Sequence, residues 1–155
     1  MIDFDIKVTT PRGVYKAGRG LAEYIGEMAN SIETVVGEAE MDELAKIVED
    51  SQRGNILKQI QPTGSGLRDL KASTWKRKKS NLKLFETGRL FDSIDYKRSG
   101  KLSRKIFAGA DYAGYLQFGT SKMKAFHFFG LSSETKKDMS VYIIEKLRNA
   151  LKRKS

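Results

Sequence analysis

The sequence of 155 residues contains no cysteine and a single histidine. It therefore has neither a disulfide framework nor a thiolate metal site, and zinc, which takes several Cys or His ligands, would find only His127. We predict no metal site and no cofactor; magnesium held by carboxylates alone stays an open alternative. His127 lies between Phe126 and Phe128, and these aromatic neighbours favour a strand beside the core over a catalytic histidine.

Long apolar runs are also missing. No stretch approaches the roughly 20 apolar residues that cross a bilayer. The start, MIDFDIKVTT, carries acids where a signal peptide carries bases. We expect a protein made in the cytosol, without a membrane partner.

Acidic residues are scarce in the second part of the chain. Residues 1–60 hold 7 Lys/Arg and 11 Asp/Glu, whereas residues 61–155 hold 22 and 8, for a net charge of +10 overall. This separation suits nucleic acid binding at the basic part, or subunits that attract one another head to tail. Two solvated charged faces are the plain alternative.

The first 60 residues combine a strand pattern with a helix pattern. Residues 2–8 alternate apolar and polar side chains, as a half-buried strand does. Apolar residues then recur at helical spacing over 21–36 and again over 41–60. We expect one bent helix or two helices, with a break near Gly37 or Arg53-Gly54.

A basic stretch follows. Pro62 to Gly66 form a cluster of turn residues, and the chain from there to Lys83 has seven Lys/Arg, one Asp and few apolar side chains. We predict a mobile arm at about 62–83, because so few apolar groups do not offset the entropy of ordering. Trp75 beside the basic run suits a phosphate-backbone contact, and a solvated loop is the alternative.

The remaining chain predicts four elements, with turn residues between them. They are a short helix ending at Ile94, a hairpin around Ser99-Gly100, a helix over 112–118 ended by Gly119, and a last helix capped by Ser132 or Ser133. The predicted fold class is α+β. A small antiparallel sheet packs against a long N-terminal helix and a C-terminal helix, with an extended basic arm, in a single domain of residues 1–155.

No catalytic set emerges from the motifs. Gly64-Ser65-Gly66 lacks the spacing of a nucleophile elbow, and Ser99 to Ser103 lacks the glycine and the hydroxyl residue of a phosphate-binding loop. Asp92, Asp95 and Asp111 show no spacing of an acid and base pair. We predict that the protein is not an enzyme.

Three stretches carry a family resemblance through their order and spacing. The first is Gly66 to Thr74 with the basic residues after it, and the second is Leu84 to Ile94, of pattern L-x-x-T-G-x-L-x-x-S-I. The third is Tyr112 to Thr120, of pattern Y-A-x-x-x-Q-F-G-T, with Phe128 to Gly130. Together they resemble the Mu-like virion morphogenesis family of tailed phages. Leu67 departs from this family's usual tryptophan, and residues 124–128 lack its proline and arginine.

The resemblance implies a structural role. The subunit would join the finished tail to the DNA-filled head, or complete the tail, by assembling into a ring, for which six-fold symmetry is one arrangement. Its partners would be copies of itself, other neck or tail proteins and DNA passing through the joint. It would lie in the virion, and in the host cytoplasm during assembly. A small basic nucleic-acid-binding protein is the alternative function.

Two groups of residues carry this hypothesis. Predicted assembly or DNA contacts are Arg68, Lys71, Lys76, Arg77, Lys78, Lys79, Gln117 and Thr120. Predicted structural residues are Thr87 as a helix N-cap, Gly88, Leu90, Ile94, Tyr112, Phe118, Gly119 at positive φ, and Phe128 in the core. For the basic arm, the expected partner is the 21–45 stretch of an adjacent copy, which has seven Asp/Glu and no Lys/Arg.

Overall fold

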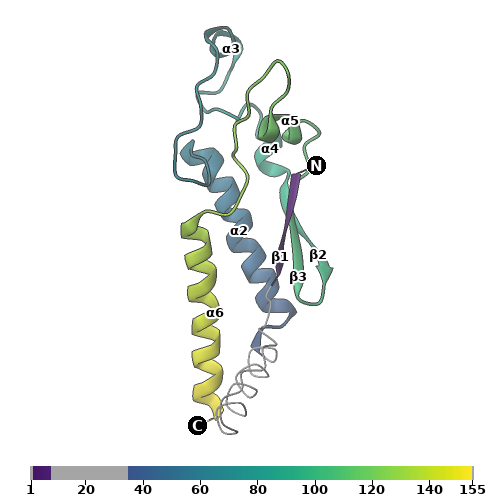
Figure 1. Ribbon diagram of the computed structural model, residues 1–155, viewed down its shortest axis with the longest axis vertical. Coiled ribbons are helices and arrows are strands. Elements are labelled where there is room, and N and C mark those ends of the chain that lie inside the picture. Colours follow the sequence, from purple (N-terminus) through teal and green to yellow (C-terminus); the bar gives the residue numbers. More distant parts are fainter. Residues whose placement is uncertain (1, 8–34, 155) are drawn as a thin grey trace, which may run out of the picture.

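The computed structural model describes residues 2–7 and 35–154 of the chain (Figure 1). The predicted α+β class is confirmed. In chain order the elements are β1 (Ile2–Lys7), α2 (Glu38–Lys58), α3 (Ala72–Arg77), α4 (Arg89–Asp92), β2 (Ile94–Gly100), β3 (Ser103–Ala108), α5 (Ala113–Phe118) and α6 (Ser133–Lys154). The helix predicted over 21–36 lies outside the described residues, apart from its last two.

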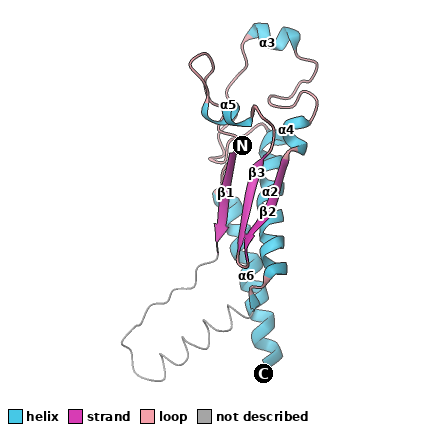
Figure 2. Cartoon of the chain, turned by 90° about the vertical axis from the view of Figure 1, so that its right-hand side faces the viewer, coloured by secondary structure: helices cyan, strands magenta, loops and turns pink. Residues whose placement is uncertain are grey.

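The sheet has three strands in the order β1-β3-β2, and both neighbours of β3 are antiparallel to it. Both the predicted hairpin and the predicted N-terminal strand are therefore present. Alternate residues of β3, Arg104, Ile106 and Ala108, are buried, and α2 packs against β3 and β2. Helix α6 packs on α2. The result is an elongated molecule in which α2 lies between the sheet and α6 (Figures 1 and 2).

Helix α2 begins at Gly37, whose extended backbone ends the preceding turn and whose N–H donates to the Glu40 carboxylate at 3.1 Å. The expected break at Gly37 is thus present. The alternative place for the break, Arg53-Gly54, lies within a continuous helix, because α2 continues to Lys58. Asn55 is buried directly after Gly54. Packing there outweighs the roughly 1 kcal/mol by which a glycine weakens a helix.

A buried arginine ties the hairpin turn to the start of α2. The side chain of Arg104 is fully buried, and its guanidinium donates to the Asp42 carboxylate, to the Glu38 carbonyl at 2.9 Å and to the Gly100 carbonyl at 2.9 Å. Arg98 also reaches Asp42, at 2.7 Å. Hydrogen bonding to Arg104 is the main cause that lowers the pKa of Asp42. This cluster fixes one end of the molecule.

The aromatic segment 126–129 is not a strand, which corrects the sequence-based expectation. Phe126, Phe128 and Phe129 are buried, but amide side chains hold the backbone in place of a neighbouring strand. Asn55 donates to the Phe128 carbonyl at 3.2 Å. Gln52 donates to the Gly130 carbonyl at 2.9 Å and accepts from its N–H at 2.8 Å. His127 is exposed with φ of +46°, so it is not a core residue.

Helix α6 begins with a side-chain cap, as predicted for Ser132 or Ser133. The Ser132 hydroxyl accepts a hydrogen bond from the Thr135 N–H at 3.0 Å. The Thr135 hydroxyl in turn bonds the Ser51 hydroxyl on α2. Among the described residues, no helix has the length and apolar character to cross a membrane.

Candidate interaction cleft

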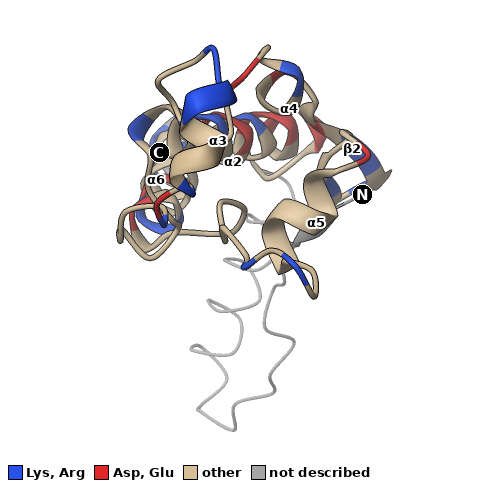
Figure 3. Ribbon diagram, turned by 90° about the horizontal axis from the view of Figure 1, so that it is seen from above, with Lys and Arg blue, Asp and Glu red and all other residues tan. Residues whose placement is uncertain are grey.

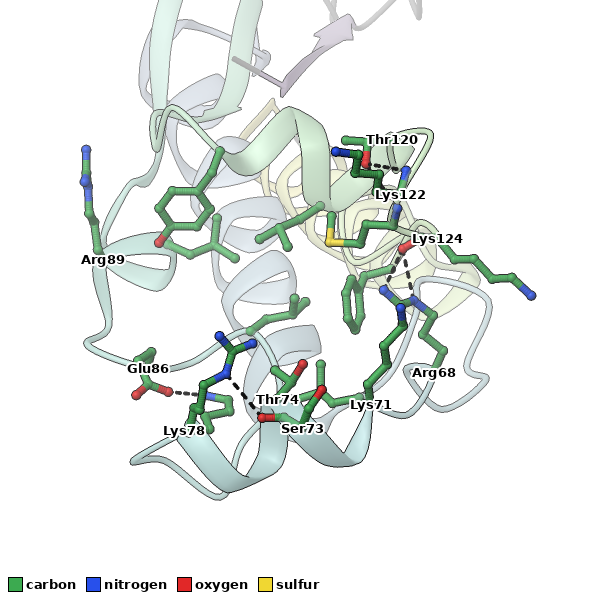
Figure 4. Close-up of a pocket in the computed structure, with 18 of the residues that line it drawn as sticks. Arg68, Lys71, Ser73, Thr74, Lys78, Glu86, Arg89, Thr120, Lys122 and Lys124 are labelled. Atoms are coloured by element: carbon green, nitrogen blue, oxygen red, sulfur yellow. Dashed lines mark hydrogen bonds and ion pairs between the residues drawn. The ribbon is translucent and has the colours of Figure 1, made fainter.

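A cleft of about 1030 Å³ opens at the end of the molecule that carries α3, α4 and α5 (Figure 4). Four stretches far apart in the sequence line it, namely 68–78, 84–90, 112–116 and 120–126. The second and third belong to the motif segments that carry the family resemblance, and the first contains most of the predicted contact residues. The fold thus brings together residues that the sequence could only place in order.

The rim of the cleft is basic. Among the described residues that line it, the only acid is Glu86, and the cations are Arg68, Lys71, Arg77, Lys78, Arg89, Lys122 and Lys124. Figure 3 looks down onto this end, where α3 carries Lys and Arg and α5 carries no charged residue. An unbalanced set of cations around one opening favours an anionic partner.

Some of these cations hold the cleft together. The Arg68 guanidinium lies 3.8 Å from the centre of the Phe126 ring and donates to the Lys124 carbonyl at 2.7 Å. Lys78, whose side chain is only 9% exposed, donates to the Glu86 carboxylate at 2.7 Å and to the Phe85 carbonyl. The Lys78 hydrogen bond is the main cause that lowers the pKa of Glu86. Arg68 and Lys78 are therefore structural, although they were predicted as assembly or DNA contacts.

Other cations remain available to a partner. Lys71 lies on the α3 side of the cleft, and Lys122 and Lys124 lie on the opposite loop (Figure 4). All three are exposed, and within the described part of the chain none of their ammonium groups has an acidic partner within 4.0 Å. Sequence reasoning missed Lys122 and Lys124, because nothing in the local sequence shows that they face α3. Arg89, also missed, pairs with Asp111 at 3.0 Å.

The inner surface of the cleft is apolar. Leu90 and Phe126 are buried at its base. Four half-buried side chains that pack on the core complete it, namely Leu70, Leu84, Leu116 and Met123. A partner that fills the cleft must therefore offer apolar groups as well as negative charge.

Helix α5 presents aromatic side chains to solvent beside the cleft. Tyr115 is 63% exposed and Phe118 is 74% exposed, whereas Ala113 is buried. Tyr112 and Leu116 line the cleft itself. Large exposed aromatics are enriched in protein interfaces. Phe118, predicted as a structural residue, thus lies on the surface and not in the core.

Gly119 ends α5 at φ of +78°, as predicted. A Cβ atom at this position would lie 2.7 Å from the Met123 carbonyl oxygen and 2.9 Å from the Ala125 nitrogen. Thr120 then closes a turn, because its hydroxyl accepts from the N–H groups of Lys122 and Met123. Only glycine fits this close approach of two backbone segments.

The expectation that Gln117 faces a neighbouring subunit is not supported by its contacts. Its amide donates to the Phe129 carbonyl at 2.9 Å and accepts from the Phe129 N–H at 3.0 Å. Both polar groups are thus used within the chain. Like the Gln52 side chain, the Gln117 side chain makes the pair of backbone hydrogen bonds that a neighbouring strand would otherwise make to the aromatic segment.

The helix start at Thr87-Gly88 also differs in detail. Helix α4 begins at Arg89 with Gly88 as its N-cap, at φ of +83°, and no side chain caps it. Thr87 is exposed, so its predicted N-cap role is wrong: the left-handed backbone that glycine allows makes the turn. Leu90 and Ile94 are buried as predicted.

Two of the predicted basic contact residues lie outside the cleft. Lys76 and Lys79 are exposed but do not line it.

The described acids of the 21–45 stretch are already paired. Glu38 binds Arg98 at 2.8 Å, Asp42 binds Arg98 and Arg104, and Glu43 binds Lys46 at 3.0 Å. Glu40 accepts from Gly37 and lies 3.7 Å from Lys146. These four carboxylates are therefore poor candidates for a contact with another copy.

Within residues 2–7 and 35–154, no group of three or more His, Asp or Glu side chains is arranged to hold a metal ion. The chain matches no protein-family model, no curated protein and no solved structure. The resemblance to the virion morphogenesis family consequently rests on the three motif segments alone.

Proposed function

We propose that the protein is a structural subunit of a tailed-phage particle, which acts in tail completion or head-to-tail joining by assembling with copies of itself. The observation that supports this most is the cleft. Motif segments 84–90 and 112–116, together with the basic arm, meet there, and Tyr115 and Phe118 stand exposed on the adjoining helix. An apolar and basic surface at one end of an elongated molecule suits a contact between subunits.

A nucleic-acid-binding protein is the second candidate, and the seven cations around the cleft favour it. The apolar inner surface of the cleft argues against nucleic acid as its partner. Single-stranded nucleic acid could stack on the exposed rings of Tyr112, Tyr115 and Phe118. A phosphate backbone, however, gains nothing from contact with the leucine and methionine side chains of the inner surface, so a protein partner fits this surface better.

Electron microscopy of the purified protein, alone and with isolated tail tubes, tests the proposal. We expect closed rings or density at a tube end. Replacing Tyr115 and Phe118 by serine should abolish both, because these side chains would be buried in the assembly. Val141 and Ile144 on α6 are 45% and 47% exposed, so the same substitution there is the matched control and should leave assembly intact. Wild-type protein that stays monomeric with and without tubes would contradict the proposal.

A further inference from the structure

One end of the molecule carries the hairpin turn between β2 and β3, and the other end carries the basic cleft. Strand β1 ends at Lys7, which pairs with Ser103 beside the hairpin turn. Helix α2 begins near the same turn, because Arg104 donates to the carbonyl of Glu38. Lys7 and the residues just before α2, which flank residues 8–34, therefore both lie at the hairpin end. The basic cleft is lined by residues of α3, α4 and α5, and these helices lie at the opposite end of the molecule from the hairpin turn (Figure 1).

The segment attached at the hairpin end has the composition that the cleft requires. Residues 21–36 contain Glu23, Glu27 and Glu33 and no Lys or Arg. Its apolar side chains recur at helical spacing, at Leu21, Tyr24, Ile25, Met28 and Ile32, whereas Val36 is buried in the core of its own copy. The segment thus offers three glutamates to three lysines that have no acidic partner among the described residues, and it offers apolar side chains to an apolar inner surface.

As a helix, a copy's own segment would be shorter than the α2 helix that separates its point of attachment from its own cleft. Helix α2 has 21 residues, which at 1.5 Å per residue makes it about 31 Å long. The 16 residues of 21–36 would extend about 24 Å in helical form, and they are joined to the far end of α2.

We infer that the cleft binds residues 21–34 of a second copy of this chain. The lysines at positions 71, 122 and 124 receive the glutamates, and the leucine and methionine side chains of the cleft receive the apolar stripe. The contact joins unlike surfaces, head to tail, and therefore generates a ring or an open helix of subunits. This inference rests on the proposed function and names the surfaces through which its subunits would meet.

Paired charge reversals test the contact. One variant carries Lys71→Glu, Lys122→Glu and Lys124→Glu, and the other carries Glu23→Lys, Glu27→Lys and Glu33→Lys. Sedimentation velocity should show each variant alone associating at least about a hundredfold more weakly than wild type, because like charges would face each other. Mixing the two should restore association, because each then offers the charge that the other lacks.

A control variant with Lys101→Glu, Lys136→Glu and Lys137→Glu has the same change in net charge at exposed sites outside the cleft, and it should associate like wild type. Circular dichroism melting of every variant checks that the fold is kept. If wild type forms rings and the cleft variant forms them equally well, the inference fails while the ring-forming function stands. If wild type neither self-associates nor binds tail tubes, the proposed function fails as well.

Nucleic acid is a separate outcome of the same experiment. Fluorescence anisotropy with a labelled DNA duplex is measured on the same variants. If the three lysine substitutions abolish DNA binding and leave self-association unchanged, the occupant of the cleft is nucleic acid and the inference is overturned. Loss of self-association that mixing does not restore would overturn it equally, because the glutamates would then not be the partners of the lysines.

Discussion

At the scale of single residues, Gly119 is the position where the backbone tolerates least change. Its φ of +78° and ψ of −176° belong to a region that is accessible essentially to glycine alone. Gly119→Ala should therefore lower the free energy of unfolding by at least about 1 to 3 kcal/mol, with a further cost from the 2.7 Å approach to the Met123 carbonyl. Chemical denaturation followed by circular dichroism measures this.

Gly114 is the matched control for Gly119. It lies in α5, where a Cβ atom would meet nothing within 4 Å, so Gly114→Ala should be neutral or stabilising by about 0.5 to 1 kcal/mol. Equal effects of the two substitutions would contradict the assignment of strain to Gly119.

A second prediction at this scale separates two phenylalanines. Phe128 is fully buried, whereas Phe118 is 74% exposed. Phe128→Ala should cost about 3 to 5 kcal/mol of stability, and Phe118→Ala should change the melting temperature little. If Phe118→Ala destabilised the monomer as much as Phe128→Ala, Phe118 would be a core residue and not a contact for a partner.

At the scale of elements, the buried arginine makes the joint between the hairpin and α2 sensitive to acid. The pKa of Asp42 is lowered in the folded state, so this carboxylate stabilises the protein above its unfolded pKa of about 3.9, and the stabilisation is lost as the pH falls through the lower folded pKa. Asp42→Asn should melt well below wild type at pH 7. This difference should shrink below about pH 4, as measured by thermal melts across the acid range.

Removing Arg104, the partner of Asp42, should lower the free energy of unfolding more than Asp42→Asn does. Arg104→Ala leaves Asp42 without its main hydrogen-bond donor and should cost about 3 to 5 kcal/mol, as expected for breaking a buried pair. Arg98 bonds the same carboxylate, but its side chain is 60% exposed, so Arg98→Ala should cost much less. Similar losses in the two variants would show that burial of Arg104 does not decide the strength of the joint.

The basic arm remains predicted to be mobile in the free subunit, and the structure narrows that prediction to residues 71–77. Arg68 and Lys83 anchor the start and the end of the arm, through the Lys124 carbonyl and Asp69 respectively. The described hydrogen bonds of residues 71–77 stay within 71–78. Hydrogen exchange should be fast there and slow in α2, and equal protection in the free subunit would contradict the prediction.

The elements themselves could be predicted because each has a local pattern. Alternation showed the strands, and apolar spacing showed α2 and α6. The support of the aromatic segment could not be predicted, because it depends on Gln52, Asn55 and Gln117, whose partners are 12 to 78 residues away. One signal was present: Gln52 and Asn55 continue the buried stripe of α2 after Val48, and a polar residue in such a stripe needs a buried partner.

The cleft was only partly predictable for a similar reason. The basic arm and the α5 motif were recognised separately, but their juxtaposition depends on Arg68 stacking on Phe126 across 58 positions of the chain. Charge alone also gave the wrong role for Lys78, because a lysine in a basic run gives no sign that its side chain will be buried and paired with Glu86.

At the scale of the whole molecule, the separation of charge predicts how assembly responds to salt. Exposed ion pairs are screened over about 8 Å at physiological ionic strength and over about 3 Å at 1 M. Self-association of wild type should therefore weaken steadily as sodium chloride is raised, with the melting temperature of the monomer nearly unchanged. Sedimentation velocity over a salt series measures it, and salt-independent association would point to α5 aromatics alone as the interface.

The pairing of β1 with β3 sets the order of events during synthesis. Ile2 pairs with Ala108, and in the described sheet β3 is the only neighbour of β1. This pairing waits until more than a hundred further residues have been translated, which takes on the order of 5 to 20 seconds. During that interval β1 is an unpaired strand able to join other nascent chains. Asp3 and Asp5 between its apolar residues act as gatekeepers against such pairing, so replacing both by threonine should leave the finished fold intact while driving the newly made protein into inclusion bodies.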